Sequence, residues 1–221
     1  MREGVALCLK DLLIEWRSRD RVVSTLLFAL LVVLVFHFAL PGGATARTQE
    51  NAPGLLWVAY ILAALFGLGR AFSLELDNDA IAGLALAPVE RGWIFLGKAA
   101  ANLVILALAQ AVTALAFALV FELDVFAVAG RLAGLVLLGS LGLCAIGTFF
   151  SAVAVRTRFR EVMLPLLMLP LLVPVLSGAV RATTSLFETG SVPFDAVQLL
   201  IVTDAIYLIG SFLLFDFVVD E

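Results

Sequence analysis

IFLGKAAANLVILALAQAVTALAFALVF, residues 94–121, is an apolar run with a single charged side chain, Lys98. A helix needs about 20 apolar residues to cross a hydrocarbon core about 30 Å thick, and this run exceeds that length. Backbone groups in lipid must form their hydrogen bonds within the segment, whereas a spanning strand of a barrel alternates apolar and polar residues. The run therefore predicts a transmembrane helix.

Five further apolar runs surround this one and fill almost the whole chain. They predict spans at residues 22–40, 55–74, 132–155, 162–180 and 196–219, in a chain of 221 residues with a hydrophobic fraction of 63%. The stretches between the runs are too short for a soluble catalytic domain, and a water-soluble protein is excluded. Residues 1–221 are therefore predicted to form one all-α integral membrane domain, with six transmembrane helices within residues 22–219.

The placement of basic residues predicts the orientation of the chain. If the N-terminus faces the cytoplasm, eleven of the fourteen Lys and Arg residues fall in inner segments. The outer loops then hold three, namely Arg47, Arg131 and Arg181. The positive-inside rule places both termini in the cytoplasm on this basis. Interfacial aromatic belts are also predicted, on the outer side from Trp57 and Tyr60 and on the inner side from Trp16 and Trp93.

Residues 1–21 are predicted to form an amphipathic helix at the inner interface. Its apolar stripe consists of Val5, Leu9, Leu12, Leu13 and Trp16. Charged residues lie roughly opposite, at Glu3, Lys10 and Arg17. Such a helix can anchor and orient the first span, and it can also form part of a docking surface for a partner. Both roles stay open.

The cytoplasmic loop at residues 70–98 contains a second predicted helix, which is too short to span a bilayer. Asp77 or Asn78 can cap its start, and Pro88 ends it. Nearby acidic residues favour its N-terminal end because of the helix dipole. Its apolar face is formed by Ile81, Leu84 and Ala85. This face predicts contact with lipid headgroups, with other helices or with a groove on a soluble partner.

Residues 92–98, GWIFLGK, match the GxxxxGK part of a nucleotide-binding P-loop. Ala99 stands where a Ser or Thr hydroxyl would hold Mg²⁺, and no strand is predicted before the run. We therefore expect Lys98 to reach the membrane interface from the third span rather than to bind phosphate. The sequence has no metal-ligand spacing and no nucleophile elbow. The chain is predicted not to be an enzyme.

Glycines and prolines mark two of the spans. The fourth span has GxxxG spacing at Gly130 and Gly134, which predicts close helix packing, and continues with Gly139, Gly142 and Gly147. The fifth span loses backbone hydrogen bonds at Pro165, Pro170 and Pro174, which predicts a bend. Kinked helices often line transport pathways, but a kink for packing explains the prolines equally well.

Two titratable side chains lie within the spans. Asp204 is deep in the sixth span, where a carboxylate costs about 2.5–3.5 kcal/mol on insertion scales. It is expected to face a cavity or a partner, to bond to a neighbouring helix, or to lie near the outer headgroups. His37, the only histidine, lies near the outer end of the first span and can ligate haem iron or pack at the interface. The candidate residues of a substrate path are His37, Pro170, Pro174 and Asp204.

Together these features resemble the haem exporter protein B family (CcmB-like), the membrane subunit of the ABC-type complex for cytochrome c maturation in bacteria and some mitochondria. The resemblance rests on stretches that sample nearly the whole chain in order. They are KDLLIEWRSRD at 10–20, APGLLWVAY at 52–60, LAPVERGWIFLGK at 86–98, the glycine-rich fourth span and LPLLVPVL at 169–176.

The resemblance implies a six-helix permease of ABC-2 type in the bacterial inner membrane, present as a homodimer on two ATP-hydrolysing subunits. It also implies a haem-handling membrane subunit, a small helical subunit and a haem chaperone as partners, besides membrane lipid, and no nucleic acid. ATP and Mg²⁺ would bind the ATPase subunit, and haem would be a substrate rather than a cofactor of this chain. The runner-up functions are a lipid or drug exporter and a mechanical transmission subunit that carries no substrate.

Permeases of ABC-2 type have an acidic loop helix between spans two and three that couples them to the ATPase subunit. The resemblance assigns this role here to Arg70, Glu75, Asp77, Asn78, Asp79, Ile81, Gly83, Leu84, Leu86 and Pro88. The sequence departs from many relatives at two positions of this helix. Asp79 stands where they have Gly, and Ala82 stands where they have Glu.

Overall fold

The computed structural model describes residues 2–40, 46–69, 91–154 and 160–220, and all regular structure in these ranges is α-helical. The helices are α1 (Arg2–Ser18), α2 (Asp20–Ala39), α3 (Ala46–Leu68), α6 (Arg91–Phe121), α7 (Val125–Ala154), α8 (Arg160–Thr189) and α9 (Phe194–Asp220). Six of them, α2 to α9, are long and apolar enough to cross a membrane. The predicted all-α membrane fold with six spans is confirmed.

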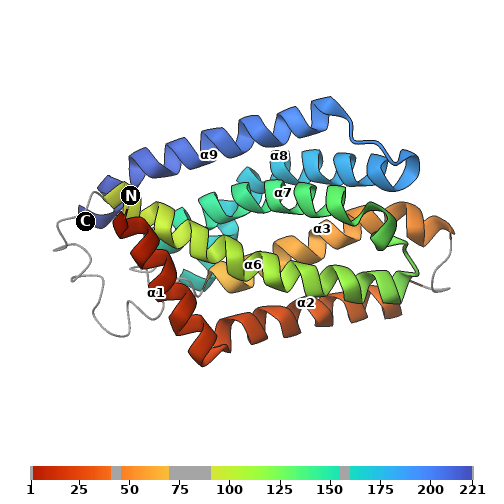
Figure 1. The fold of residues 1–221 in the computed structure, drawn as a ribbon, viewed down its shortest axis with the longest axis horizontal. Coiled ribbons are helices and arrows are strands. Elements are labelled where there is room, and N and C mark those ends of the chain that lie inside the picture. The colour runs from red at the N-terminus through yellow and green to blue at the C-terminus, as the bar shows by residue number, and fades with distance from the viewer. Residues whose placement is uncertain (1, 41–45, 70–90, 155–159, 221) are drawn as a thin grey trace.

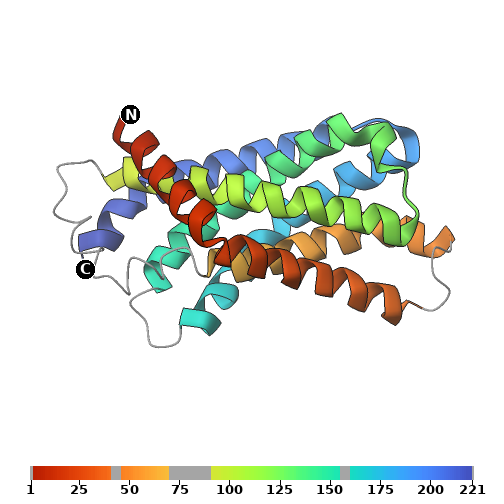
Figure 2. The ribbon, with the colours of Figure 1, turned by 60° about the horizontal axis from the view of Figure 1, so that its bottom comes forward.

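The six long helices form one bundle, and α1 crosses it at one end (Figure 1). α7 packs against α6, α8 and α9, while α2 packs against α3 and α6. α2 and α9 therefore lie on opposite flanks of the bundle, as the two views show (Figures 1 and 2). The start of α1 and the end of α9 lie at the same end, which we call the α1 end. This placement agrees with an even number of spans.

Most of the helices are longer than the apolar runs that predict them. α6 has 31 residues and α7 has 30, and at about 1.5 Å per residue each is roughly 45 Å long. A hydrocarbon core of about 30 Å covers two thirds of that length. The polar ends therefore continue as helix beyond the apolar stretch. For the same reason α7 begins at Val125 rather than at Leu132, and α8 continues to Thr189.

Three turns use backbone conformations with positive φ. Gly190 (φ 68°) ends α8, and its N–H donates to the carbonyl of Leu186 over 3.1 Å, a common helix end. Arg19 (φ 58°) separates α1 from α2, and Glu122 (φ 55°) separates α6 from α7. Non-glycine residues rarely adopt this conformation, so the contacts around these two turns must hold them. The helix predicted over residues 1–21 accordingly ends at Ser18.

The predicted outer aromatic belt is wrong for Trp57 and Tyr60. Both side chains are in the core of the bundle, with exposed fractions of 0% and 1%. Trp57 Nε1 donates to Thr183 Oγ1 of α8 over 2.9 Å, and the Tyr60 hydroxyl donates to the carbonyl of Gln110 of α6 over 3.2 Å. The polar group of each ring thus has a hydrogen-bond partner inside the protein, so it does not depend on water or headgroups at the membrane interface. Trp16, on the inner side, is exposed as predicted.

Close packing of α7 uses other glycines than the predicted pair. A methyl group added at Gly130 or Gly134 would meet nothing within 4 Å, so these two glycines face open space. At Gly139 it would lie 2.5 Å from the Trp57 ring, and at Gly142 it would collide with Asp204. The tight contacts of α7 therefore lie in its middle.

The helix α8 continues through its three prolines as a single element from Arg160 to Thr189. Near the last of them, the Ser177 hydroxyl donates to the carbonyl of Pro174 over 3.0 Å. The prolines face different surroundings: Pro170 is exposed and Pro174 is half-buried.

Candidate functional site

The N-terminal part of α6 forms the surface, or seat, on which α1 packs. A methyl group added at Gly97 would lie 2.5 Å from the backbone oxygen of Gly4, and one added at Gly4 would lie 3.0 Å from the backbone oxygen of Trp93. The two helices therefore touch backbone to backbone, which requires glycine on both sides. On α9, Phe212 occupies the equivalent space beside Gly92. The two glycines of the P-loop-like stretch thus serve helix contacts.

A buried ion pair fixes α1 in this seat. Lys98 Nζ lies 3.1 Å from Asp11 Oδ2, and the Lys98 side chain is 2% exposed. The expectation that Lys98 reaches the interface is therefore wrong, because a carboxylate 87 residues earlier neutralises it inside the protein. Burial, and then the charge of Asp11, raises the pKa of the Cys8 thiol on the same helix. Cys8 is half-buried and free.

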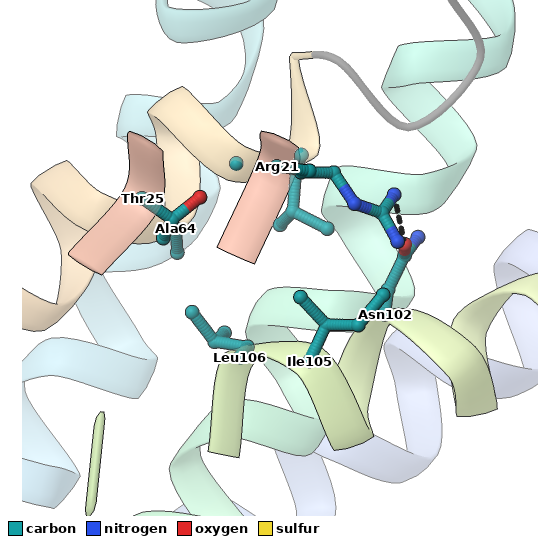
Figure 3. A pocket seen from close by; sticks show the side chains of 8 residues that line it. Arg21, Thr25, Ala64, Asn102, Ile105 and Leu106 are labelled. Atoms are coloured by element: carbon teal, nitrogen blue, oxygen red, sulfur yellow. Dashed lines mark hydrogen bonds between the residues drawn. The ribbon is translucent and has the colours of Figure 1, made fainter. Parts of the chain in front are cut away.

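A second polar chain starts at Glu15 and crosses four helices. Glu15 Oε1 accepts the Val22 N–H over 2.8 Å, which caps α2, and Glu15 Oε2 lies 3.4 Å from Arg21 Nε. Arg21 Nη1 donates to Asn102 Oδ1 of α6 over 3.0 Å, as Figure 3 shows. Asn102 Nδ2 then donates to Thr148 Oγ1 of α7 over 2.8 Å. The contacts link α1, α2, α6 and α7.

We call these six residues the α1 junction: Asp11, Glu15, Arg21, Lys98, Asn102 and Thr148. Beside it is a small cavity of about 10 Å³ between α2, α3 and α6, lined in part by Arg21, Thr25 and Asn102 (Figure 3). Thr25 packs closely on Gly67 of α3. The cavity has about the size of one water molecule and is far too small for an organic ligand.

The α1 junction has the properties of a mechanical connection rather than of a catalytic centre. Its acids and bases are paired with one another, and among the described residues no group of three His, Cys, Asp or Glu side chains could hold a metal ion. Ion pairs and hydrogen bonds in an interior of low dielectric constant fix both the distance and the direction between their groups. A displacement of α1 would therefore also displace α6 and α2. The site can therefore transmit force between the end of the bundle and its core.

The predicted ATPase-coupling residues, Arg70 to Pro88, lie outside the described residues. The candidate substrate-path residues are described, and they are spread over three helices. His37 on α2 is half-buried beside Phe121, with ring centroids 6.5 Å apart. Asp204 on α9 lies between α7 and α8, against Gly142 and close to Val175. α2 and α9 do not pack against each other, so His37 and Asp204 lie apart.

Sequence reasoning missed most of the α1 junction and the interior bonds of Trp57 and Tyr60. Asp11 and Glu15 look like ordinary polar residues of an amphipathic helix. Asn102 and Thr148 look like isolated polar residues in apolar runs. A signal was available in their position, because Asn in an apolar span needs a hydrogen-bond partner. The identity of that partner depends on how the helices fold together.

Thr183→Val is expected to lower the free energy of unfolding by about 0.6–2 kcal/mol, the range for hydrogen bonds between membrane helices. Valine keeps the shape but leaves Trp57 Nε1 without its acceptor in the core. The effect is measured as a lower midpoint of thermal unfolding in detergent. Thr184→Val, one residue further and half-buried, is the control. Equal shifts for both variants would mean that the Trp57 bond contributes nothing.

This chain is similar to known proteins over nearly its whole length. A family model described as CcmB protein matches residues 2–220. Heme exporter protein B of Paracoccus denitrificans is 33% identical over 204 residues, which cover 92% of this chain and 90% of that protein. The protein of the same name from Rhodobacter capsulatus is 34% identical over 171 residues, or 77% and 78% of the two chains. That of Pseudomonas aeruginosa is 30% identical over 171 residues, 76% of each chain.

Proposed function

This chain belongs to the CcmB protein family, and from that premise we propose that it is the membrane subunit of an ABC-type haem exporter for cytochrome c maturation. The observation that carries the proposal is the match over residues 2–220 combined with six helices able to span a membrane. The relatives at 30–34% identity bear the name Heme exporter protein B. The membrane is the bacterial inner membrane, with both termini in the cytoplasm.

ATP hydrolysis in this proposal belongs to a separate subunit. Lys98 of the P-loop-like stretch is paired with Asp11, and Gly92 and Gly97 pack against other helices, which supports this division of roles. The chain pairs with a second copy and with two ATPase subunits, and it works beside a haem-handling membrane subunit, a small helical subunit and a haem chaperone. The residues of the 70–88 loop transmit the motion of the ATPase.

Transport and mechanical transmission remain two forms of this function. The interior of the single chain is filled with large side chains, among them Trp57, Tyr60 and Phe117. Within the described residues, then, a haem path through one protomer has no support. His37 and Pro174 are half-buried and Pro170 is exposed, so a path lined by them would run between two copies. The four-helix α1 junction is the feature that favours transmission.

Leu84→Asp tests the coupling to the ATPase. The family resemblance implies that Leu84 enters a groove on the ATPase, where an unpaired carboxylate costs several kcal/mol. Each 1.4 kcal/mol is about tenfold in affinity, so the ATPase should be lost on co-purification while the variant stays in the membrane. Cytochrome c assembly should fail in the same cells.

Leu9→Asp is the matched control, because Leu9 is an exposed apolar residue of α1. It should leave the ATPase bound. If Leu9→Asp releases the ATPase and Leu84→Asp does not, α1 is the docking element. If the wild-type chain co-purifies with neither an ATPase nor a haem-binding membrane protein, the proposed function fails.

A further inference from the structure

The buried stripe of α9 contains a carboxyl group. The stripe consists of Ala196, Leu200, Thr203, Asp204, Ser211 and Phe215. Asp204 is 3% exposed, near the middle of the helix and turned into the bundle. Its two carboxyl oxygens are both buried and have no hydrogen-bond partner among the described residues. Such a group is rare, because buried polar atoms are almost always bonded.

The neighbours of Asp204 are shaped to receive it, and the Gly142 backbone lies close to its carboxyl group, but no hydrogen bond of ordinary geometry reaches either oxygen. Gly142 of α7 leaves the space that Asp204 Oδ1 fills, since a methyl group there would collide with this oxygen. Val175 of α8 closes the same space, with its Cγ2 3.2 Å from that methyl position. Tyr207, one turn along α9, donates its hydroxyl to the carbonyl of Leu171 over 2.6 Å. The notch therefore fits the shape of a carboxyl group and supplies no countercharge.

Charged groups on the helices that pack against α9 lie at the ends of the bundle. On α6 they are Arg91 and Lys98, at the α1 end, and Lys98 is paired with Asp11. At the far end, Arg131 of α7 donates to the Gly190 carbonyl, Arg181 of α8 pairs with Asp195, and Glu188 is exposed. The described titratable groups in the middle are Tyr207, in electrostatic contact with Asp204, and the buried thiol of Cys144.

We propose that Asp204 is a proton-binding site, in which the side chain is seated against Gly142 as the neutral carboxylic acid at neutral pH. The reason is that a carboxylate in this notch would be a buried charge with no described cation beside it and no hydrogen bond of ordinary geometry to either oxygen. Such charges are strongly disfavoured, and the group takes up a proton instead. The ligand is a single proton, bound to one carboxyl oxygen, and its release leaves the carboxylate.

The proton controls the contact between α7 and α9. When the proton leaves, the negative charge lies against the backbone of Gly142 and beside Val175, with no described cation to neutralise it. The charge can be solvated only if α9 moves away from α7. The packing of α9 is therefore coupled to the protonation of Asp204, independently of whether the chain exports haem.

Infrared spectroscopy tests the bound proton directly. The purified wild-type chain at neutral pH should show the C=O stretching band of a protonated carboxyl group, in the range typical of an acid without strong hydrogen bonds. In Asp204→Asn this band should be lost completely. Aspartate labelled with ¹³C should shift the band in the wild type, which assigns the bound proton to an aspartate side chain even if the variant does not fold. A neutral-pH spectrum without the band overturns the proposal.

The pH dependence of stability gives a second readout. With Asp204 protonated in the folded state and ionised in the unfolded state, the folded chain binds the extra proton, so stability must fall as the pH rises. The midpoint of thermal unfolding should fall more steeply in the wild type than in Asp204→Asn as the pH rises from about 4, where an aspartate of the unfolded chain ionises, to neutral. Parallel curves for the two proteins would show that unfolding releases no proton from Asp204 in this range, which contradicts the proposal.

Discussion

Lys98→Met is expected to release α1 partly from the bundle and to lower the free energy of unfolding by about 1–3 kcal/mol. Methionine keeps much of the volume of the lysine side chain but leaves the carboxylate of Asp11, which is 14% exposed, without its partner at 3.1 Å. The loss is destabilising because the carboxylate of Asp11 is mostly shielded from solvent and keeps only the half-exposed Lys10 beside it. The Gly4–Gly97 contact and the bonds of Glu15 to Val22 and Arg21 then hold α1.

Cys8 on α1 reports this release. It is half-buried when α1 is seated, whereas Cys144 is buried in α7. In Lys98→Met the rate of Cys8 alkylation should rise while Cys144 stays unreactive, because exposure returns the pKa of the Cys8 thiol toward its ordinary value. The alkylated fractions can be read by mass spectrometry.

Lys10 supplies the matched control. Its Nζ lies 3.2 Å from the other oxygen of Asp11, but its side chain is 44% exposed. Exposed ion pairs contribute about 0–1 kcal/mol, so Lys10→Met should change neither the thermal midpoint nor Cys8 labelling by much. Asp11→Asn should restore part of the stability of Lys98→Met. Equal effects of the two lysine substitutions would refute a special role of the buried pair.

Gly142→Ala is expected to separate α7 from α9 and to cost about 1–3 kcal/mol through overpacking. The added methyl group would occupy the position of Asp204 Oδ1, and the short aspartate side chain cannot swing away. The helices must therefore move apart in the middle of the bundle. The midpoint of thermal unfolding should fall, and the yield of folded protein in detergent should fall with it.

The same helix offers the opposite result at Gly134. A methyl group there meets nothing within 4 Å, so Gly134→Ala should be neutral or should stabilise the isolated chain by up to about 1 kcal/mol. Combining Gly142→Ala with Asp204→Ala should recover much of the loss, since the collision disappears. If the double variant is as unstable as the sum of the single variants, the two residues do not interact.

The sequence predicted the spans because apolar length is a property of each segment alone. Interior polar partners are another matter, as Lys98 and Trp57 show. A lysine near the end of an apolar run usually reaches water, and here Asp11 from another helix keeps it inside. Tryptophan is typical of the membrane interface. The N–H of Trp57 is instead accepted in the core by Thr183, which lies 126 positions away along the chain. Such pairings arise when helices assemble.

The small-residue pattern of α7 illustrates the same limit. GxxxG spacing identifies a face on which helices can approach, but not whether a helix of the same chain does so. Gly130 and Gly134 face open space, while Gly142, outside that spacing, receives Asp204. The family resemblance was confirmed, because it depends on the order of stretches along the chain and not on which surfaces meet.

The 87 positions between Asp11 and Lys98 also impose a delay during translation, because Asp11 is synthesised well before its partner. At about 5–20 residues per second, a ribosome needs roughly 4–17 s to reach Lys98 after it has made Asp11. During this interval the first two spans can enter the bilayer, yet α1 has neither its countercharge nor the glycine against which it lies. If synthesis stops before the third span is made, α1 stays without its binding site on α6. Quality-control proteases can recognise such a chain as unfinished.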